Sequence, residues 1–593
     1  MQASGWIQFA LYIVALALIT KPMGLYLLQV LDANGRTWLD PVVRPVERVT
    51  YRLMGVDSSK EHNWKQYTLA MLLFSLVGCL FTYAILRLQN ILPLNPQGLG
   101  PVSSHLAFNT AVSFTTNTNW QNYSGESTMS YFSQMVALAF HNFVSAATGI
   151  AIAAALVRAI ARHSANTLGN FWVDLVRVTY YLLLPICLVF AVFLVSQGMI
   201  QNFKPYTKAT LVEPMKVQVE KKNDKGETIK GADDKPVMEE QTVTEQNIVQ
   251  GPMASQVAIK MLGTNGGGYV NANAAHPFEN PTPLTNFVEL LAIVVIPAAF
   301  THTFGRMVGR PRDGWVIFWT MTALFVVGLL VCNWAETSTQ PALANHVVGG
   351  NMEGKEVRFG TGASALAAVV TSNAATGSYN SMVDSFQPLG VAVPLLNMLI
   401  GEIVYGGLGT GLYSMIFVAL IALFVGGLMI GRTPEHLGKQ IGPPEMKIIA
   451  LYTLIAPVTV LALTALAVVT KAGLGGLTTN TGPHGFTEIL FAYASAFANN
   501  GQSMAGLSAN NIFYNTTTII AMLAGRYALA VLALSLAGRF AAMSRRPPSL
   551  GTMPSDGFVF GVLLAGTALL LGALNFLPAL ALGPIVEHFS IHS

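Results

Sequence analysis

The sequence has 593 residues, of which 52% are hydrophobic and only 10% are charged. A soluble globular protein carries fewer apolar and more charged residues, so this chain is predicted to be a polytopic membrane protein. The net charge of +4 is small for the length, and lysine and arginine lie in short clusters between apolar runs, which gives no support to nucleic-acid binding.

The three cysteines, Cys79, Cys187 and Cys332, each lie inside an apolar run and show no paired spacing. They are predicted to be buried small hydrophobic residues, with neither a zinc site nor a disulfide framework.

Ten apolar runs of about 20 residues follow one another along the chain, and each predicts a membrane helix. The first run continues through Lys21 and Pro22 without a small-residue cleavage site, so it is predicted to be a retained helix rather than a signal peptide. The predicted helices are Trp6 to Val30, Trp64 to Leu86, Tyr131 to Ala159, Phe171 to Ser196, Asn286 to Phe304, Trp315 to Trp334, Leu395 to Ile430, Ile448 to Val469, Ile512 to Leu536 and Phe558 to Leu580.

Basic residues gather in every second connection between these helices. Such clusters mark cytoplasmic loops, so both termini are expected on the extracytoplasmic side. The clusters are Arg36, Arg44, Arg48 and Arg52; Arg158 and Arg162; Arg306, Arg310 and Arg312; Arg432, Lys439 and Lys447; and Arg539, Arg545 and Arg546.

The other four connections are too long for turns, and each contains an apolar stretch too short to span a membrane, followed by a polar loop. This pattern is typical of a re-entrant pore helix and its filter, where the backbone stays unpaired because it lines a wet pore. The four pairs are Ser104 to Phe114 with Thr115 to Asn119, Pro252 to Leu262 with Thr264 to Gly268, Thr361 to Val370 with Ala375 to Ser378, and Phe486 to Phe497 with Asn499 to Gly501.

The predicted fold is therefore an all-α polytopic membrane protein with ten transmembrane helices. It consists of four repeats of helix, re-entrant pore loop and helix, with one extra helix at each end. The predicted units are 1–63 with the first helix and a cytoplasmic loop, 64–160, 161–306, 307–432 and 433–546 as pore repeats one to four, and 547–593 with the final helix.

The polar loops offer carbonyl and hydroxyl oxygens but no ring of acidic residues. Glycine adopts left-handed backbone without cost and asparagine tolerates it, so successive carbonyls can turn to one side. Such oxygens suit a hard monovalent cation, and the C-terminal ends of the pore helices add partial negative charge. The first loop has no glycine, so the filter is expected to be asymmetric. The predicted filter residues are Thr116, Asn117, Thr118, Thr264, Asn265, Gly266, Gly267, Ala375, Thr376, Gly377, Asn499, Asn500 and Gly501.

The second extracytoplasmic connection contains a charged insertion at about 211–249. Val217 and Val219 alternate with polar residues ahead of a turn at Lys225-Gly226, so a solvated β-hairpin and a disordered loop are both open for this segment.

A dense group of glycines interrupts the third repeat's second helix: Gly401, Gly406, Gly407, Gly409 and Gly411. Each interior glycine costs a helix about 0.5 to 1 kcal/mol relative to alanine. The group indicates either a helix broken in mid-membrane or close packing through small residues. Gly407 and Gly409 are the gating candidates.

Four charged residues in or near apolar runs are also candidates. Arg526 fits either a structural ion pair or a role in the ion path. Glu289 and Glu402, near predicted helix starts, are expected at the wet interface. Arg432 fits a cytoplasmic anchor or a coupling contact with a partner.

The motifs together resemble the A subunit of the Kdp potassium-transporting ATPase family, the channel-like member of the potassium transporter superfamily. The resemblance covers essentially the whole chain, although the third loop matches that family's pattern less closely. It places Gln121 at the filter entrance, just after the first loop. It is carried by Thr116 to Gln121, Gly263 to Gly268 with Asn271 to Asn273, Asn499 to Gly501 with Gly506 to Asn510, and Gly431 to Glu435.

The resemblance implies a potassium-binding and translocating subunit of a high-affinity uptake pump in a bacterial inner membrane. Potassium is the transported ion, no organic cofactor is implied, and ATP is used by a partner, a P-type ATPase catalytic subunit. A small single-span accessory subunit and a tiny lipid-like subunit complete such complexes within the membrane lipids. The sequence agrees, since it holds no Asp-Lys-Thr-Gly motif and no Walker loop, so the chain is not an enzyme by itself.

The sequence is compatible with two other functions. The first is a stand-alone potassium channel or transporter of the same superfamily. The second, an intramembrane enzyme, is disfavoured because neither His-Glu-x-x-His nor Gly-x-Ser-x-Gly occurs.

Overall fold

The computed structural model describes residues 3–32, 35–221, 237–338, 351–429, 431–432, 434–545, 547 and 552–592. Within these ranges, ten helices are long and apolar enough to cross a membrane, as predicted. They are α1 (Ala3–Leu31), α3 (Trp64–Leu88), η1 with α6 (Ser133–Ala139, Phe140–Ala161), α7 with η2 and α8 (Phe171–Arg177, Val178–Leu183, Leu184–Ser196), α10 (Pro283–Met307), α11 (Pro311–Thr337), α14 (Thr410–Met429), α15 (Pro443–Val469), α18 with η5 and α19 (Ile512–Leu523, Ala524–Ala528, Leu529–Ala542), and α20 (Phe558–Leu580), which continues through η6 (Ala581–Ile585) into α21 (Val586–His592).

Four shorter helices correspond to the predicted pore helices: α4 (Ser104–Thr115), α9 (Met253–Leu262), α12 (Gly360–Asn373) and α17 (Gly482–Ala498). A further apolar helix, α13 (Pro388–Leu399), packs against α11, α12 and α17 inside the bundle. The remaining elements are short connections or lie outside the bundle. They are α2 (Asp40–Met54), α5 (Gly125–Thr128), η3 (Asn273–Ala275), η4 (Val383–Ser385), α16 (Lys471–Leu474), and strands β1 (Thr207–Glu220), β2 (Met238–Ile248), β3 (Glu435–His436) and β4 (Lys439–Gln440).

Side-chain caps fix where several spans begin. Asn63 precedes α3, and its side-chain oxygen accepts hydrogen bonds from the backbone N–H groups of Lys65 and Gln66, each at 3.0 Å. The Gln66 side chain accepts in return from the Asn63 N–H, so the first turn satisfies its own donors. Thr282 and Thr285 form the same reciprocal pair at the start of α10.

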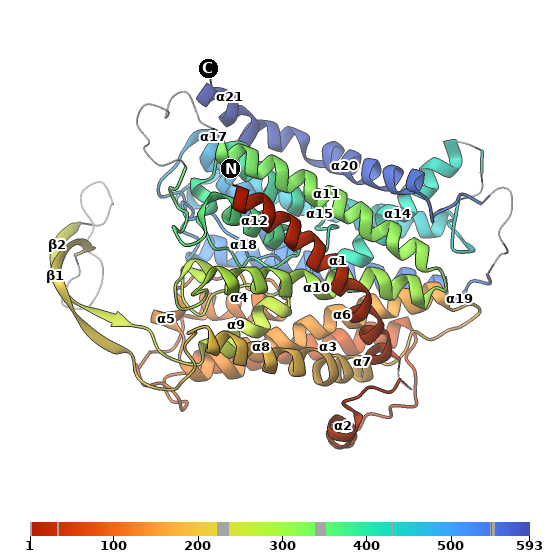
Figure 1. The fold of residues 1–593 in the computed structure, drawn as a ribbon, viewed down its shortest axis with the longest axis horizontal. Helices are drawn as coiled ribbons and strands as arrows, with labels where there is room; N and C mark the ends of the chain where they lie inside the picture. Colours follow the sequence, from red (N-terminus) through yellow and green to blue (C-terminus); the bar gives the residue numbers. More distant parts are fainter. Residues whose placement is uncertain are drawn as a thin grey trace.

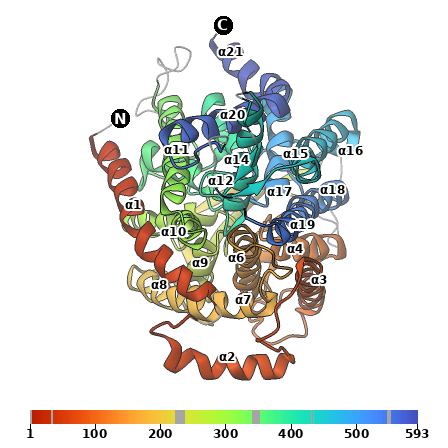
Figure 2. The same ribbon diagram turned by 90° about the vertical axis from the view of Figure 1, so that its right-hand side faces the viewer.

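The pore helices lie at the centre of the bundle. Figure 2, viewed roughly along the spans, places α4, α9, α12 and α17 around the middle of the molecule. Among the ten spans, α6, α10 and α14 are the most buried, whereas α1 and α20 expose most of their surface. Cys187 and Cys332 are buried, Cys79 is half-buried, and all three thiols are free, as predicted.

The two ends of the bundle differ in charge and in shape. Figure 1 shows the N-terminal start of α1, the end of α21 and the β1–β2 hairpin at one end of the spans. The connections α10–α11, α14–α15 and α19–α20, which carry the basic clusters, lie at the other end. Helix α2 lies across the spans and outside the bundle (Figures 1 and 2).

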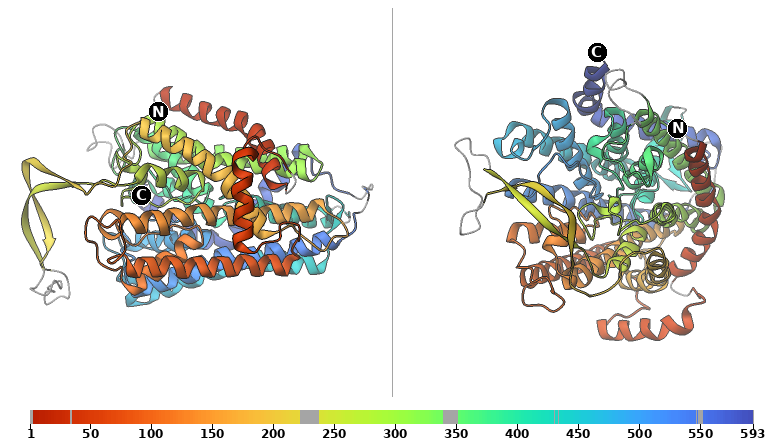
Figure 3. Two further views of the ribbon diagram at one scale, coloured as in Figure 1. Left: turned by 90° about the horizontal axis from the view of Figure 1, so that it is seen from below. Right: turned by 60° about the vertical axis from the view of Figure 1, so that its left-hand side comes forward.

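The charged insertion forms a β-hairpin rather than an irregular loop. Strands β1 and β2 pair antiparallel from Thr207 with Ile248 to Glu220 with Met238, with a bulge between Thr210 and Met215. Figure 3 shows the hairpin projecting away from the helices. The predicted turn at Lys225-Gly226 lies outside the described residues.

The glycine group breaks the third repeat's second helix. Helix α13 ends at Leu399 and α14 begins at Thr410, so ten residues between them are not helical. The predicted interruption is confirmed, whereas a single span from Leu395 is wrong because α13 starts earlier, at Pro388, and stops before the glycines. The loop 400–409 is left within the membrane part of the bundle, next to the pore helices.

Candidate functional site

Each pore helix is followed by a segment whose residues alternate between left-handed and right-handed backbone. Such alternation turns successive carbonyl oxygens to the same side, as a dehydrated cation requires. The left-handed residues, with their φ angles, are Asn117 (67°) and Asn119 (51°), Thr264 (48°), Gly266 (65°) and Gly267 (74°), Ala375 (49°) and Gly377 (75°), and Asn499 (56°) and Gly501 (79°). The second segment thus ends in two consecutive left-handed glycines.

We call residues 116–119, 264–267, 375–377 and 499–501 the central ring, and number its segments in chain order. Every predicted filter residue lies in one of these segments. Their role as potassium ligands stays a prediction.

Hydrogen bonds join the first ring segment to the second. The Asn117 side-chain amide donates to the carbonyl oxygen of Thr264 at 3.0 Å. Two residues later, the Asn119 amide donates to the carbonyl oxygen of Gly266 at 2.9 Å. Asparagine thus tolerates the left-handed backbone of the first segment and also links that segment to its neighbour.

Close backbone contacts at glycine join the other segments. A Cβ added to Gly266 would overlap the carbonyl oxygen of Thr376 in the third segment. In the same way, a Cβ on Gly377 would overlap the Asn500 oxygen, and one on Gly501 would overlap the Thr118 oxygen. The contacts run from the second segment to the third, the fourth and the first, so the ring closes in chain order. Glycine is required at these three positions by both its φ angle and its lack of a side chain.

Gln121 is bound to the backbone of the second loop rather than free at an entrance. Its side-chain N–H donates to the Gly268 carbonyl oxygen at 3.0 Å, and its side-chain oxygen accepts from the Gly268 N–H at 2.7 Å. These two bonds hold the chain after the first segment against the chain after the second.

Glu402 lies beneath the ring and not at the wet interface. It is 4% exposed, has a left-handed φ of 48°, and accepts a hydrogen bond from the Asn500 amide at 2.9 Å. Glu289 is also buried, at 1% exposure. The interfacial position predicted for both glutamates is therefore wrong, because Glu289 in α10 and Glu402 in the loop after α13 both face the interior of the bundle.

The loop 400–409 contacts the ring directly. The Leu408 N–H donates to the Thr264 hydroxyl at 2.9 Å. A Cβ on Gly407 would lie 3.0 Å from the Ala375 Cβ, and Gly409, with φ of 91°, packs against the Gly149 carbonyl in α6. The two gating candidates thus touch the ring and α6, so a substitution there alters packing as well as stiffness.

Arg526 lies in the π-helical turn η5. Gly525, next to it, is so close to the end of α17 that a Cβ would overlap the Phe497 carbonyl oxygen. The Arg526 guanidinium is 4% exposed and donates to the Ser145 carbonyl oxygen at 2.7 Å. No acid lies within ion-pair distance of it among the described residues, so the predicted ion pair is not formed.

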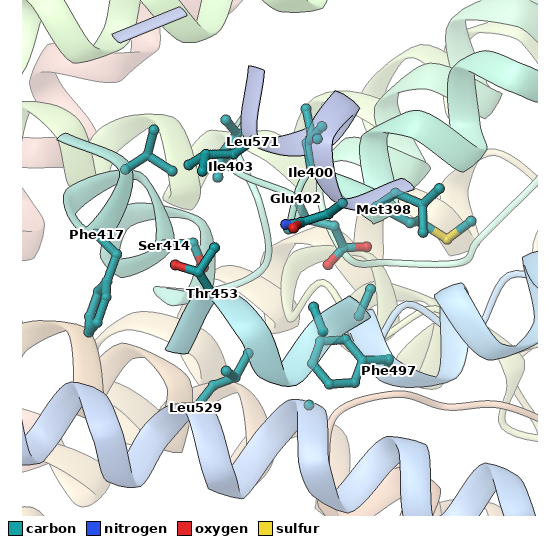
Figure 4. Close-up of a pocket in the computed structure, with 18 of the residues that line it drawn as sticks. Met398, Ile400, Glu402, Ile403, Ser414, Phe417, Thr453, Phe497, Leu529 and Leu571 are labelled. Carbon is teal, nitrogen blue, oxygen red and sulfur yellow. The ribbon is translucent and has the colours of Figure 1, made fainter. Parts of the chain in front are cut away.

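A cavity of about 100 Å³ extends sideways from the underside of the ring. Glu402 and Asn499 line it near the ring, and side chains of α14, α15 and α20 line it further out. Figure 4 shows the Glu402 carboxylate in this cavity, with Met398, Phe497 and Leu571 around it. Its walls are mostly apolar, and α20 is among the most exposed spans.

Arg432 lies far from the ring, in the basic connection between α14 and α15. Its guanidinium donates to the Thr552 carbonyl oxygen at 3.3 Å, which joins that connection to the one between α19 and α20. The neighbouring Thr433 lies outside the described residues.

Lys260 is a buried cation behind the second ring segment, and it is not among the predicted site residues. Its ammonium group pairs with Glu279 and donates to the Asn273 side-chain oxygen at 2.7 Å. The Lys260 carbonyl accepts from the N–H groups of Asn265 and Gly266. A lysine inside the short apolar stretch 253–262 was the available signal.

The contacts between ring segments form a closed ring of four unlike loops, each at the C-terminal end of a short helix. The sequence matches the family described as KdpA, potassium-transporting ATPase A subunit, over residues 10–589. The chain belongs to this family. The resemblance seen in the loop motifs is therefore confirmed.

Full-length relatives agree with the family match. The chain is 51% identical to the potassium-transporting ATPase potassium-binding subunit of Methylorubrum extorquens (strain PA1), over 100% of this chain and 98% of the relative. It is 49% identical to the subunit of the same name in Koribacter versatilis, over 100% and 99%, and 52% identical to that of Ralstonia pickettii, over 98% and 99%.

Proposed function

We propose that this chain binds extracytoplasmic potassium in the central ring and passes it to a P-type ATPase subunit as part of a high-affinity uptake pump. The observation that carries the proposal is the closed ring of alternating left-handed backbone at the ends of four helices. Carbonyl oxygens replace the hydration shell of a hard monovalent cation, and four helix C-termini add partial negative charge.

The proposed units are the four pore repeats 64–160, 161–306, 307–432 and 433–546, with 1–63 and 547–593 as flanking helices. Each repeat contributes one ring segment, which accounts for a ring that follows chain order. In this arrangement the hairpin end, with both termini, faces the extracytoplasmic side of a bacterial inner membrane. The basic connections face the cytoplasm.

The path beyond the ring runs sideways in this proposal. Arg526 has no ion-pair partner among the described residues and places its positive charge near the first segment, since Ser145, whose carbonyl accepts from Arg526, also donates to Asn117 at 2.7 Å. In this proposal, a cation that moves from the ring past Ser145 is repelled by Arg526. The cavity lined by Glu402 instead extends toward α20. The P-type ATPase subunit, which uses ATP, then receives the ion at that side.

The complex includes two further partners, a small single-span accessory subunit and a tiny lipid-like subunit. Membrane lipids cover the rest of the exposed spans. Helix α2 suits the membrane surface, because the exposed Val42, Val46, Val49 and Leu53 form one stripe along it and Arg44, Arg48 and Arg52 another. We assign no organic cofactor to the chain.

Two measurements test the proposal. The tagged chain should co-purify a P-type ATPase whose hydrolysis rate rises with potassium. Liposomes that contain this chain alone should show no steady potassium flux, whereas flux without ATP or a partner would favour a stand-alone channel.

A further inference from the structure

Four titratable side chains meet about 20 Å from the central ring, at the opposite end of α17. His484 and Glu488 lie one turn apart in the first half of α17. Asp384 comes from η4, shortly after the third ring segment, and Glu587 comes from the C-terminal helix α21. The His484, Asp384 and Glu587 side chains are 19%, 10% and 15% exposed, so solvent reaches the cluster.

Glu587 orients the imidazole. The Nδ1–H of His484 donates to the Glu587 carboxylate at 2.6 Å, which leaves Nε2 directed to the other two acids. Nε2 lies 3.2 Å from Asp384 Oδ1 and 3.9 Å from Glu488 Oε1. A carboxylate on one imidazole nitrogen with the other nitrogen facing acidic oxygens is the usual arrangement of a metal-binding histidine.

Glu488 supplies the second observation. It is 0% exposed, and the Asn480 amide donates to its Oε1 at 2.7 Å. Its Oε2 has no hydrogen-bond partner among the described residues. A buried carboxylate oxygen without a donor is costly. Because the Asn480 amide already occupies Oε1, Oε2 is the oxygen of Glu488 that a bound cation would satisfy.

We propose that His484 Nε2, Asp384 and Glu488 bind a divalent transition-metal ion of the Zn²⁺ class. Their ligand atoms all lie within 4.8 Å of one another. Ligands at about 2.1 Å from a tetrahedral ion are about 3.4 Å apart, close to the 3.2 Å between His484 and Asp384. Glu488 lies farther out, with Oε1 3.9 Å from His484 Nε2, so its side chain has to move inward to complete the set, and water takes the open position.

The chemistry of the ligands separates this site from the central ring. An imidazole nitrogen with two carboxylates selects zinc-like ions over potassium or magnesium, which prefer oxygen ligands alone. The bound ion would join α17, η4 and, through His484, α21. It would therefore stabilise the extracytoplasmic face without entering the potassium path.

The test is a titration of the metal-stripped, full-length chain, in its complex, with Zn²⁺ against a competing chelator. We expect one Zn²⁺ per chain, with binding lost or weakened at least 100-fold in His484→Ala and Glu488→Gln. His163→Ala, which removes an exposed histidine outside the cluster, should bind as the wild type does. Glu587→Gln should weaken binding 10- to 100-fold, because it removes the acceptor that orients the ring.

Glu488→Gln keeps an oxygen for the Asn480 amide, so it decides the question even if His484→Ala does not fold. Zn²⁺ should raise the thermal unfolding midpoint of the wild type and of His163→Ala but not that of Glu488→Gln. Absence of a stoichiometric site in the wild type overturns the proposal. Wild-type affinity in Glu488→Gln overturns it as well, because the ion then lies elsewhere.

Discussion

The Asn500 side-chain amide donates a hydrogen bond to the Glu402 carboxylate at 2.9 Å, joining the fourth ring segment to the loop beneath the ring. An acidic side chain is thereby held under a ring that otherwise offers only carbonyl, amide and hydroxyl oxygens. The contact links the fourth pore loop to the loop 400–409 between α13 and α14.

We expect Glu402→Gln to weaken apparent potassium affinity while the Asn500 hydrogen bond is retained. A carboxylate about 8 Å from a cation attracts it by about 2 kcal/mol at an effective dielectric of about 20. The half-saturating potassium concentration of ATPase activity should rise about 10- to 30-fold. Glu289→Gln is the control, since it also neutralises a buried glutamate but one with no hydrogen-bond partner in the described structure. An unchanged value in Glu402→Gln would remove Glu402 from the ion path.

Gly266→Ser should lower affinity and relax selectivity against sodium. The added Cβ overlaps the Thr376 carbonyl oxygen, and left-handed backbone costs a residue other than glycine about 1 to 2 kcal/mol. Gly309→Ser is the matched control, because Gly309 has a similar φ of 74° but no atom within 4 Å of the added Cβ. Potassium and sodium titrations of ATPase activity separate the two variants. Equal effects would show that backbone strain, and not the ring contact, is what matters.

Gln121→Glu should weaken potassium binding although it adds negative charge at the proposed filter entrance. Glutamate can accept from the Gly268 N–H, but its second oxygen faces the Gly268 carbonyl, where the glutamine N–H donates now. Loss of that bond and the repulsion that replaces it cost about 1 to 3 kcal/mol. A tighter half-saturation in ATPase assays would indicate that charge at the entrance outweighs the geometry of the loop.

The ring segments could be predicted because each is marked locally. A short apolar stretch followed by asparagine, threonine or glycine is visible in the sequence at 104–119, 253–268 and 486–501, and the hairpin was one of two structures that alternating Val217 and Val219 allowed. The contacts around the ring could not be predicted in this way. Gln121 pairs with a residue 147 positions later, and Leu408 with one 144 positions earlier. Only the folded arrangement brings such residues together.

The positions of Glu402 and Gly407 show a related limit. Both lie in a glycine-rich stretch, which local propensity identifies as a break but cannot orient. The sequence gives no sign that this stretch touches the ring, whereas in the structure Gly407 packs against Ala375 and the Leu408 N–H donates to the Thr264 hydroxyl. Tertiary packing decides which face of a broken helix meets its neighbours.

Two glycine variants should distinguish movement of the loop 400–409 from its contact with the ring. Gly407→Ala places a Cβ 3.0 Å from Ala375, so potassium affinity and turnover should both fall. Gly401→Ala meets no atom within 4 Å, but at φ of 86° it disfavours the present loop conformation by about 1 kcal/mol. It should change turnover about fivefold with nearly normal affinity. A large loss of affinity in Gly401→Ala would mean that the loop conformation itself shapes the ring.

The hairpin should be dispensable for transport. Its strands pair with each other and carry mostly exposed side chains, whereas Tyr206 and Gln250 on either side contact the body of the protein. Replacing 209–246 with Asn-Gly joins the paired Lys208 and Asn247 by a two-residue turn. Potassium-stimulated ATPase activity and complex assembly should stay within about twofold of wild type. Loss of assembly would instead identify the hairpin as a partner contact.

A pore assembled from identical subunits repeats every substitution around its axis, whereas the ring here is closed by four unlike segments of one polypeptide. A single codon change therefore alters the segment that carries it and the neighbour it contacts, and it is not repeated around the whole ring. Selection for growth at limiting potassium should accordingly recover a graded series of partial phenotypes at ring positions. The four segments can also differ from one another in sequence. Asn119 illustrates this, because the other three segments have a glycine at the corresponding left-handed position.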